Sequence, residues 1–355
     1  MKVLHIIYND KFLSGYINYM GLNFSEYDHT FIIRPGKYDV DLMDENKDCK
    51  IIHLKKDNEL LKKDILEMAK KSDKIIVTGV FDIAKYIFFW KNTYLRKTYL
   101  QFWGADFYGY RNVKKLSKMQ LSKSMQHSII KRCNGIINLV ENDYDELSKI
   151  FPNKVKHYVG VMPADPRREQ KFKKYLKFDN ENTEKTIIVG NSATKENCHL
   201  EAFEMLRHLK DEDLKIICPL SYGDEKYKDE VIKKGKEIFK NKFEPITEFM
   251  NYDDYLELLS KCSVGIFNNN RQQAMGNINA LLKIGKKIYL RSNTSMWKEY
   301  EKNNLMVFDI KNLSKTSYED LFRFDVKYKK QNYDNIEKKE SKWDEQWREI
   351  FENIK

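Results

Sequence analysis

The sequence has few cysteines, and they follow no pattern that would build a disulfide framework or a zinc site. Its five cysteines are scattered over 355 residues and include no CxxC pair. Disulfide-rich secreted domains and structural zinc sites both need cysteines at short, regular spacings. We therefore expect reduced, mostly buried thiols in a cytoplasmic protein, at Cys49, Cys133, Cys198, Cys218 and Cys262.

Long apolar runs are also missing. No uncharged apolar stretch reaches the roughly 20 residues that a membrane-spanning helix needs. The N-terminus, MKVLHIIYND, lacks the apolar core of a signal peptide and is typical of a first β-strand. The sequence therefore predicts a chain that does not cross a bilayer.

Spacings typical of metal sites are missing as well. The seven histidines form no HxxxH or HExxH pattern. Asp143 and Asp145 form a DxD triplet like that of some sugar transferases, but they open a helical pattern, where acidic side chains favour the helix N-terminus. We therefore predict no bound metal and no other cofactor.

Positive charge is abundant. The 64 lysines and arginines exceed the 53 acidic residues and give a net charge of +11. Such a balance favours polyanionic partners, namely nucleic acid, an anionic membrane surface or phosphorylated substrates. An apolar fraction of 41%, with 13% aromatic residues, supplies enough core material to argue against extended disorder.

Strand-like runs alternate with helical patterns along two series. This alternation predicts parallel sheets covered by helices on both faces. The first series of runs lies at 3–8, 29–34, 49–54, 74–79, 98–104, 135–140 and 155–160, and the second at 186–190, 214–220, 245–250, 263–267, 286–291 and 305–309.

The length and a highly charged segment between the two series predict two domains. We expect a first domain over 1–165, a linker over 166–185, a second domain over 186–330 and a C-terminal helix over 331–355. The last segment carries apolar side chains on one helical face and must bury them: Trp343, Trp347, Ile350, Phe351 and Ile354.

Two strand-to-helix joints in the second half carry rows of small polar side chains. The first, TIIVGNSATKENCH over 186–199, follows a strand that ends at Gly190. The second, NNNRQQ over 268–273, precedes a helical pattern over 274–285. Ligands of doubly wound sheets bind at such joints, and amides with an arginine suit a diphosphate. The alternatives are an ordinary capped loop for the first joint and a structural ion pair for Arg271.

Two features of the first half point to an acceptor site. In FWGADFYGYR, over 102–111, Asp106 follows a strand among aromatic residues, where a carboxylate can serve as a general base. The alternative is a helix cap. The segment 96–132 is rich in Lys and Arg and carries Leu121, Met125 and Ile129 on one stripe, which favours an anionic membrane surface. Its alternative is a solvated basic helix.

Taken in order, several of these motifs resemble the 4-acetamido-4,6-dideoxygalactosyltransferase family. They are WGADFY, VGNSATKENCH, YDDYLELL, RQQAMGNINALLKIG and SNTSMW, and the resemblance runs from about residue 75 to 300. The family implies transfer of a dTDP-linked amino sugar to a polyprenyl-diphosphate disaccharide. It also implies a GT-B architecture, an α/β fold with two Rossmann-like domains facing across a cleft and a C-terminal helix crossing back to the first. No metal is essential, and the location implied is peripheral, at the cytoplasmic face of the bacterial inner membrane.

The resemblance matches Trp103 to Asp106, Gly190 to Ser192, Asn197, His199 and Arg271 to Gln273, and the other candidate site residues lie in or beside loops at the ends of predicted strands. The acceptor half supplies Asp106 as the general base and Asn9, Asp10, Trp103 and Tyr108 as acceptor contacts. The donor half supplies the contacts to the nucleotide sugar: Gly190, Asn191, Ser192, Thr194, Asn197, His199, Tyr222, Arg271, Gln272, Gln273, Gly276 and Asn277. The chain departs from the family at Thr78, where the family has histidine, and over 274–277, where it has Gly-Ile-Gly-Thr.

The resulting hypothesis is a glycosyltransferase that moves a deoxy-amino or N-acetylated sugar from a dTDP- or UDP-linked donor to a lipid-linked or lipopolysaccharide-type acceptor. A nucleotide-sugar epimerase or hydrolase on the same double-Rossmann plan is the second hypothesis. A basic nucleic-acid-binding protein is the third, although no RRM, KH, helix-turn-helix or zinc-finger signature supports it.

Overall fold

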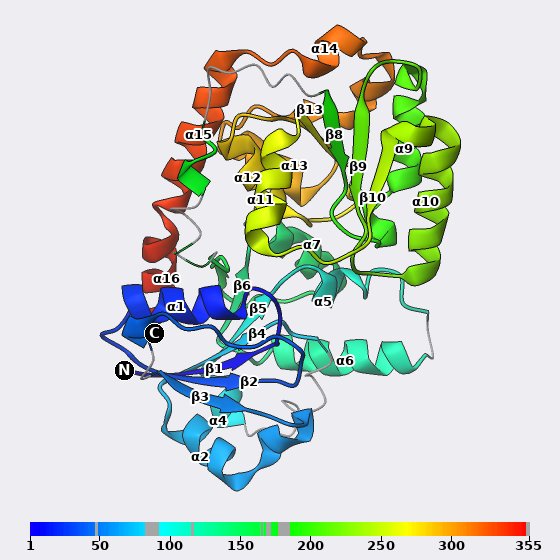
Figure 1. Ribbon diagram of the computed structural model, residues 1–355. Coiled ribbons are helices and arrows are strands. Elements are labelled where there is room, and N and C mark those ends of the chain that lie inside the picture. Colours follow the sequence, from blue (N-terminus) through cyan, green and yellow to red (C-terminus); the bar gives the residue numbers. More distant parts are fainter. Residues whose placement is uncertain are drawn as a thin grey trace. The chain divides into compact units, whose positions relative to one another are not determined.

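The computed structural model describes residues 1–46, 49–81, 92–114, 117–163, 165, 167, 172–176 and 185–352. Contacts divide the chain into two compact units (Figure 1). The first comprises Met1–Glu169 and Lys342–Lys355, and the second comprises Gln170–Ser341. Most of the expected linker, 166–185, lies outside the described residues.

The first unit is built on a parallel sheet of seven strands, and each strand-like run of the first series forms one of them. The strand order is β3-β2-β1-β4-β5-β6-β7. The strands are β1 (Lys2–Ile7), β2 (Asp28–Ile33), β3 (Lys50–His53), β4 (Lys74–Thr78), β5 (Thr98–Phe102), β6 (Gly135–Asn138) and β7 (His157–Val159).

The second unit repeats the plan with a parallel sheet of six strands. Each strand overlaps a predicted run, although the run at 245–250 shares only its first two residues with β10. Its order is β10-β9-β8-β11-β12-β13. The strands are β8 (Thr186–Val189), β9 (Lys215–Pro219), β10 (Phe243–Ile246), β11 (Val264–Phe267), β12 (Lys287–Leu290) and β13 (Phe308–Asp309).

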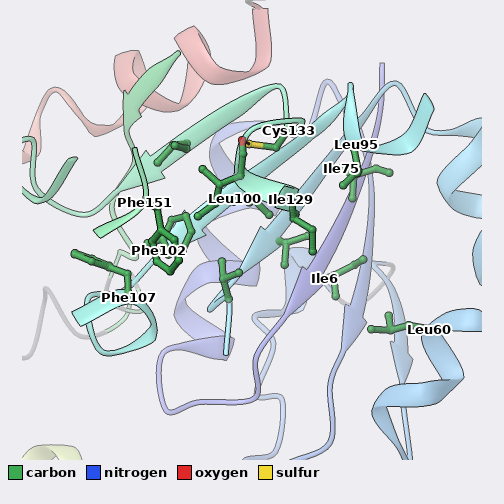
Figure 2. Close-up of a cluster of buried hydrophobic side chains, with 14 of the residues drawn as sticks. Ile6, Leu60, Ile75, Leu95, Leu100, Phe102, Phe107, Ile129, Cys133 and Phe151 are labelled. Carbon is green, nitrogen blue, oxygen red and sulfur yellow. Dashed lines mark hydrogen bonds between the residues drawn. The ribbon is translucent and has the colours of Figure 1, made fainter. Parts of the chain in front are cut away.

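Helices cover both faces of each sheet because neighbouring residues of a strand point to opposite faces and nearly all are apolar. In the first unit, Leu4 and Ile6 face one core and Val3 and Ile7 the other. Figure 2 shows the first of these cores. The helices of this unit are α1 (Leu13–Asn23), α2 (Lys63–Lys71), α4 (Asn92–Leu95), α5 (Ala105–Tyr108), α6 (Lys118–Ile130), α7 (Asp143–Ile150) and α16 (Trp343–Glu352).

The second unit has the same two-sided arrangement. Apolar residues of β8, β9, β11 and β12 divide between a core on each face of the sheet. Its helices are α9 (His199–Leu206), α10 (Glu225–Phe239), α11 (Tyr252–Lys261), α12 (Met275–Lys283), α13 (Ser295–Lys302), α14 (Tyr318–Phe322) and α15 (Val326–Glu340).

The C-terminal segment divides between the two units. Helix α15 packs on α12 in the second unit and ends at Glu340. Helix α16 begins at Trp343 and joins the core of the first unit beside α1. Trp347 is fully buried there, and its Nε1 donates to the Val161 carbonyl at 3.1 Å. Trp343 is only half-buried. The expected single helix over 331–355 is thus two helices, and only the second returns to the first unit.

No helix in the described part of the chain has the length and apolar character that a membrane span requires.

Both sheets reverse their winding between two central strands. In the first unit the reversal lies between β1 and β4, and in the second it lies between β8 and β11. Loops at the carboxyl ends of these strands diverge to opposite faces and leave a crevice where ligands of this fold class bind. The topology therefore brings the two polar joints predicted from the sequence, after β8 and after β11, next to each other.

Candidate active site

The loop after β8 begins with a glycine that no other residue can replace without strain. Gly190 has φ +69°, and a Cβ at this position would lie 2.3 Å from His199 Nε2 and 2.9 Å from Asn197 Oδ1. Its N–H donates to the Ile266 carbonyl of β11 at 2.9 Å. The absence of a side chain lets His199 and Asn197 pack directly over the end of the strand.

Asn197 joins the loop after β8 to the loop after β11. Its Oδ1 accepts from the backbone N–H of Asn191 at 3.0 Å and from Asn269 Nδ2 at 3.3 Å. Its Nδ2 donates to Ser192 Oγ at 3.2 Å and to Thr194 Oγ1 at 2.8 Å. The Asn197 amide therefore has a protein partner in every direction in which it can bond.

The loop after β11 carries the row of amides and arginine that the sequence singled out. Gln273 Nε2 lies 3.2 Å from both Ser192 Oγ and Thr194 Oγ1. Arg271 Nη1 donates to the Gln272 carbonyl at 2.9 Å, which bends the guanidinium back over its own loop. Ala274 has φ +61° before α12 begins, so the chain turns sharply at this point. The structure thus brings Gln273 together with Ser192 and Thr194, residues some 80 positions earlier.

Buried polar atoms without a partner gather at these two loops. Among the described residues of the second unit, five buried side-chain atoms lack a hydrogen-bond partner within the protein. Each such atom costs about 1–3 kcal/mol of stability, so their concentration in one place calls for a ligand or ordered water. They are Asn191 Oδ1, His199 Nε2, Asn269 Oδ1, Gln272 Oε1 and Gln273 Oε1.

His199 is a neutral imidazole in this environment. It is fully buried at the start of α9, and burial lowers its pKa to about 4. The Tyr227 hydroxyl accepts from the backbone N–H of His199 at 3.1 Å and lies 3.3 Å from its Nδ1. A neutral ring held on one side by Tyr227 can hydrogen-bond a ligand with Nε2, but it cannot supply positive charge near pH 7.

The other residues assigned to the donor lie around these loops. Tyr222, after β9, is 40% exposed, and its hydroxyl accepts from Asn191 Nδ2 at 3.0 Å. Asn277 donates to the Tyr255 hydroxyl at 2.8 Å, so its amide is anchored to α11. Gly276 is exposed, and a Cβ there would meet nothing within 4 Å.

One polar cluster beside the loops was not assigned from the sequence. Arg291, directly after β12, donates from Nε to Asn268 Oδ1 at 3.1 Å and pairs with Glu201. Asn268 Nδ2 in turn donates to Glu201 Oε2 at 3.0 Å and to the Cys198 carbonyl at 3.2 Å. The sequence did contain a signal for this cluster, because Arg291 lies at the carboxyl end of a predicted strand. Its role is to hold Asn268, and through it the start of the loop.

In the first unit, Asp106 braces the ends of two strands. Its Oδ2 accepts from the N–H of Val80 at 2.9 Å, and its Oδ1 accepts from that of Trp103 at 3.0 Å. The side chain is 3% exposed, and this burial raises its pKa to about 7 against the lowering effect of the backbone donors. A carboxyl with such a pKa can exchange a proton near neutral pH. The general-base role stays a prediction beside this structural one.

Two of the assigned acceptor contacts are already bonded inside the protein. The Asn9 amide bridges to the backbone of Tyr38, with Nδ2 2.9 Å from its carbonyl and Oδ1 accepting its N–H at 2.8 Å. The Tyr108 hydroxyl donates to Asp143 at 2.8 Å, and the ring is 7% exposed. The structure gives both residues a local role in holding loops.

The other two assigned acceptor contacts keep unpaired atoms. Asp10 Oδ1 and Trp103 Nε1 are buried without a partner in the described part of the chain. Trp103 lies in a cluster of rings at the ends of β1, β4 and β5, with centroids 6.0 Å from Tyr8 and 6.2 Å from Phe81. Half-buried rings with an unpaired indole N–H suit a sugar, which presents both C–H faces and hydroxyls.

The comparisons with known proteins identify the family. The family model described as 4-alpha-L-fucosyltransferase glycosyl transferase group 56 matches residues 25–353. The chain belongs to this family. It is therefore a glycosyltransferase, as the resemblance predicted.

Solved structures of other proteins share the fold at low identity. WaaG, a glycosyltransferase involved in lipopolysaccharide biosynthesis, matches with TM-score 0.65 and 10% identity over 99% of this chain and 100% of its own. The sucrose-phosphate synthase of Thermosynechococcus elongatus matches with TM-score 0.66 and 8% identity over 100% and 99%. A trehalose-6-phosphate structure from E. coli, bound with UDP-2-fluoro glucose, matches with TM-score 0.61 and 8% identity over 97% of each. These likenesses confirm the predicted GT-B fold.

The basic segment of this glycosyltransferase is less suited to a lipid surface than its sequence suggested. Ile129 of α6 is 1% exposed and Met125 is half-buried against the core, so the predicted apolar stripe mostly faces inward. Exposed apolar side chains remain at Met119 (46%) and Leu121 (65%). Several cations are held locally: Lys97 by two carbonyls, Arg111 by Glu146, Lys123 by the Tyr110 carbonyl and Arg132 by the Ser128 carbonyl. Residues 115 and 116 lie outside the described part.

Proposed function

We propose that this glycosyltransferase moves a deoxy-amino or N-acetylated sugar from a nucleoside-diphosphate donor to a lipid-linked or lipopolysaccharide-type glycan. The observation that carries the donor half is the set of five unpaired buried atoms at the crevice of the second unit. As placed, four of these atoms are amide oxygens and one is an imidazole nitrogen. Hydroxyl groups of a nucleotide sugar can pair them, and a phosphate oxygen can do so where an amide turns its nitrogen outward.

The donor is dTDP- or UDP-linked, and its diphosphate lies against the loops after β8 and β11. Arg271, the amides of this loop and small residues of the Gly190 loop supply hydrogen-bond donors and one positive charge for the leaving diphosphate. We propose that these groups make a metal unnecessary. The fold is shared with an E. coli structure bound with UDP-2-fluoro glucose, which supports a nucleotide-sugar donor.

The sugar is a 6-deoxyhexose derivative. The family description names an L-fucosyltransferase, and fucose is a 6-deoxyhexose, which supports this part of the proposal. The four residues Ala274, Met275, Gly276 and Asn277 follow the amide row and are candidates for reading the sugar. Gly276 leaves open space where a substituent of the ring would fit.

The acceptor glycan lies against the ring cluster of the first unit. Trp103, Tyr8 and Phe81 supply apolar faces, while Asp10 and the Trp103 N–H supply hydrogen bonds. Asp106 acts as the base that deprotonates the attacking hydroxyl in an inverting reaction. Residues 96–132, with exposed Met119 and Leu121, contact an anionic membrane surface that carries the acceptor.

A thermal-shift screen of the intact protein tests the proposal. Nucleoside diphosphates and nucleotide sugars of each base are added in turn. A ligand at 100 times its Kd raises the stability by about 2.7 kcal/mol, which is readily measured as a rise in Tm. We expect rises with dTDP, UDP and their sugars in the presence of EDTA. A panel in which no nucleotide shifts the Tm would overturn the proposed donor class.

A flotation assay with vesicles tests the membrane part. We expect binding to phosphatidylglycerol vesicles that falls when Leu121→Asp and Met119→Asp are introduced together. Equal binding of the parent to neutral phosphatidylcholine vesicles, or no binding to either, contradicts an electrostatic membrane contact.

A further inference from the structure

Four side chains at the proposed donor site form one connected hydrogen-bonded group. Asn197, Ser192, Thr194 and Gln273 contact one another at 2.8–3.3 Å, across the loops after β8 and β11. The nitrogen and oxygen ends of an amide have the same shape, so the balance of donors and acceptors decides which end faces which partner. The same balance decides which end of the Gln273 amide points away from the group and is left for a ligand.

The orientation of Asn197 is fixed by the backbone. The atom that receives the Asn191 N–H at 3.0 Å must be the oxygen, because a backbone N–H can only donate. The nitrogen of Asn197 therefore faces Ser192 Oγ and Thr194 Oγ1, and it gives one hydrogen to each. Each hydroxyl oxygen now has one acceptor position and its own hydrogen left.

Two arrangements of Gln273 complete the group. If its nitrogen faces the hydroxyls, its two hydrogens fill the last acceptor position of both, and neither hydroxyl hydrogen has a partner. If Ser192 instead donates to Thr194 Oγ1 at 3.3 Å, one Gln273 hydrogen loses its partner. Either way, two hydrogens and Gln273 Oε1 are unpaired. If the oxygen of Gln273 faces the hydroxyls, both hydroxyl hydrogens bond to it, and only the two hydrogens of the Gln273 nitrogen are unpaired.

The number of unpaired groups decides between the two arrangements. Ser192 is fully buried, so in the first arrangement its hydroxyl hydrogen can bond only Thr194 Oγ1, 3.3 Å away. The end of the Gln273 amide that points away from the hydroxyls is also buried and has no protein partner, so only a ligand or ordered water can pair it. The second arrangement leaves two unpaired hydrogens at that end in place of three unpaired groups, and it is therefore favoured.

We infer that Gln273 presents its amide nitrogen to the donor's diphosphate, and that Asn197, Ser192 and Thr194 are positioning residues that set this orientation. The inference rests on the proposed nucleotide-sugar site. A nitrogen with two hydrogens needs a partner that only accepts, and a phosphate oxygen is such a partner. Ser192 and Thr194, which the sequence assigned to donor contact, then act through Gln273.

The first test removes the amide. Gln273→Met keeps the length of the side chain without hydrogen bonding, and Gln273→Glu places a carboxylate toward the phosphate. We expect the Kd for UDP or dTDP to rise about 10- to 100-fold in Gln273→Met and further in Gln273→Glu. The Kd for the matching nucleoside, uridine or thymidine, should stay within about twofold. Gln331→Met, on α15, is the matched control for the substitution itself.

The second test separates positioning from contact. Ser192→Ala and Thr194→Val together remove the frame without adding charge, and we expect the Kd for the nucleoside diphosphate to rise about three- to tenfold. In the Gln273→Met background the same pair should add less than about twofold, because no amide remains to be oriented. Additive effects would mean that the hydroxyls themselves contact the phosphate, and the inference would be wrong.

The outcomes separate this inference from the proposed function. If the parent protein binds no nucleoside diphosphate, the proposed function fails. If the parent binds UDP or dTDP and Gln273→Met binds it equally well, only the role of Gln273 fails. A Tm within a few degrees of the parent, measured for each variant, excludes misfolding as the cause of a loss.

Discussion

The two units share a parallel, doubly wound sheet, yet the carboxyl ends of their central strands differ in chemistry. In the second unit, the loops after β8 and β11 hold amides, small hydroxyls and an arginine, bonded through Asn197. In the first unit, the corresponding ends carry rings and side chains bonded to nearby backbone, such as Asn9 and Asp106. The same topology thus supports a polar strand-end surface in one unit and an aromatic one in the other.

The difference teaches that a polar residue at a strand end is informative only together with its partners. Asn9 follows β1 and Asn197 lies in the loop after β8, and both amides bond groups within the protein. Asn197 bonds Asn269, whose own Oδ1 has no partner, whereas Asn9 bonds the backbone of Tyr38. The first arrangement fits the proposed ligand site, and the second holds a loop.

The largest expected effect concerns Asp106, because the proposed general base lies in the first unit and the proposed donor site in the second. Asp106→Asn keeps the shape but removes basicity, so turnover should fall about 10²- to 10⁴-fold if Asp106 is the base. Donor affinity, set in the second unit, should not change. Steady-state kinetics with a matched measurement of donor Kd checks this.

The structural role of Asp106 predicts a different result. An amide NH₂ in place of one oxygen would face the N–H of Val80 or Trp103, and the free energy of unfolding should fall by about 1–3 kcal/mol. A variant that loses stability but turns over at the parental rate would reduce Asp106 to a brace between strands.

The next effect tests which unit holds the end of the chain. Trp347→Ala removes a fully buried ring that packs on Tyr16 and Phe351, and it should lower the stability of the first unit by about 3–5 kcal/mol. Trp343→Ala, at a half-buried position on the same helix, is the matched control and should cost less than half as much. Hydrogen exchange read separately for each unit measures both, and equal losses in the two units would contradict the assignment of α16.

A smaller effect is expected at Arg271. Arg271→Ala should weaken binding of a nucleoside diphosphate by about 1.5–3 kcal/mol, because hydrogen bonds to charged groups are worth that much. Binding of the nucleoside should change little, since the guanidinium is proposed to contact phosphate. Calorimetric titration of both ligands gives the answer, and an equal loss for both would point to a structural arginine.

The smallest expected effect compares the pH dependence of the two units. Burial lowers the pKa of His29 and His157 to about 4 and that of His5 well below its usual value in the first unit. In the second unit it lowers the pKa of His199 to about 4. Below the unfolded value of about 6.5, the unfolded chain binds protons that the folded chain excludes, so stability is full above that pH and falls as the pH drops toward 4.

The first unit has three such histidines and the second has one. Between pH 7.5 and 6.0, the free energy of unfolding of the first unit should therefore fall by about 1–2 kcal/mol more than that of the second. The raised pKa of Asp106 acts in the opposite direction, because a proton bound only by the folded carboxyl adds stability as the pH falls through about 7. Hydrogen exchange is therefore measured in the Asp106→Asn variant. A larger loss in the second unit would contradict the expectation.

Much of the fold followed from patterns that the sequence states directly. Each of the predicted strand runs became a strand, because a parallel strand buried on both faces must be apolar along its whole length. The C-terminal helix was harder, since the apolar spacing of Trp347, Ile350 and Phe351 does not show where the preceding helix ends. The helix is interrupted around Ser341 because α15 packs on α12 in the second unit, whereas α16 packs in the core of the first unit.

The candidate site was predictable as a pair of loops but not as a set of contacts. Glycine, amides and arginine after two apolar runs pointed to the proposed donor site, and the topology brings the ends of β8 and β11 together. Tyr108 and Asn9 looked equally suitable in the sequence, but the structure gives their polar groups to Asp143 and Tyr38. The Arg291–Glu201 pair was missed because its members lie 90 positions apart.

The sequence by itself determined the class of fold, the two polar joints and the family, because these depend on local periodicity and on short motifs read in order. Only the tertiary structure decided which side chains remain free to bind. A hydrogen-bonding group can bind a ligand only where no neighbouring group in the protein already bonds it. Neighbours such as Ser192 and Gln273 come into contact only after folding. The fully buried Ser192 and the unpaired end of Gln273 are properties of that packing, which no stretch of the sequence contains alone.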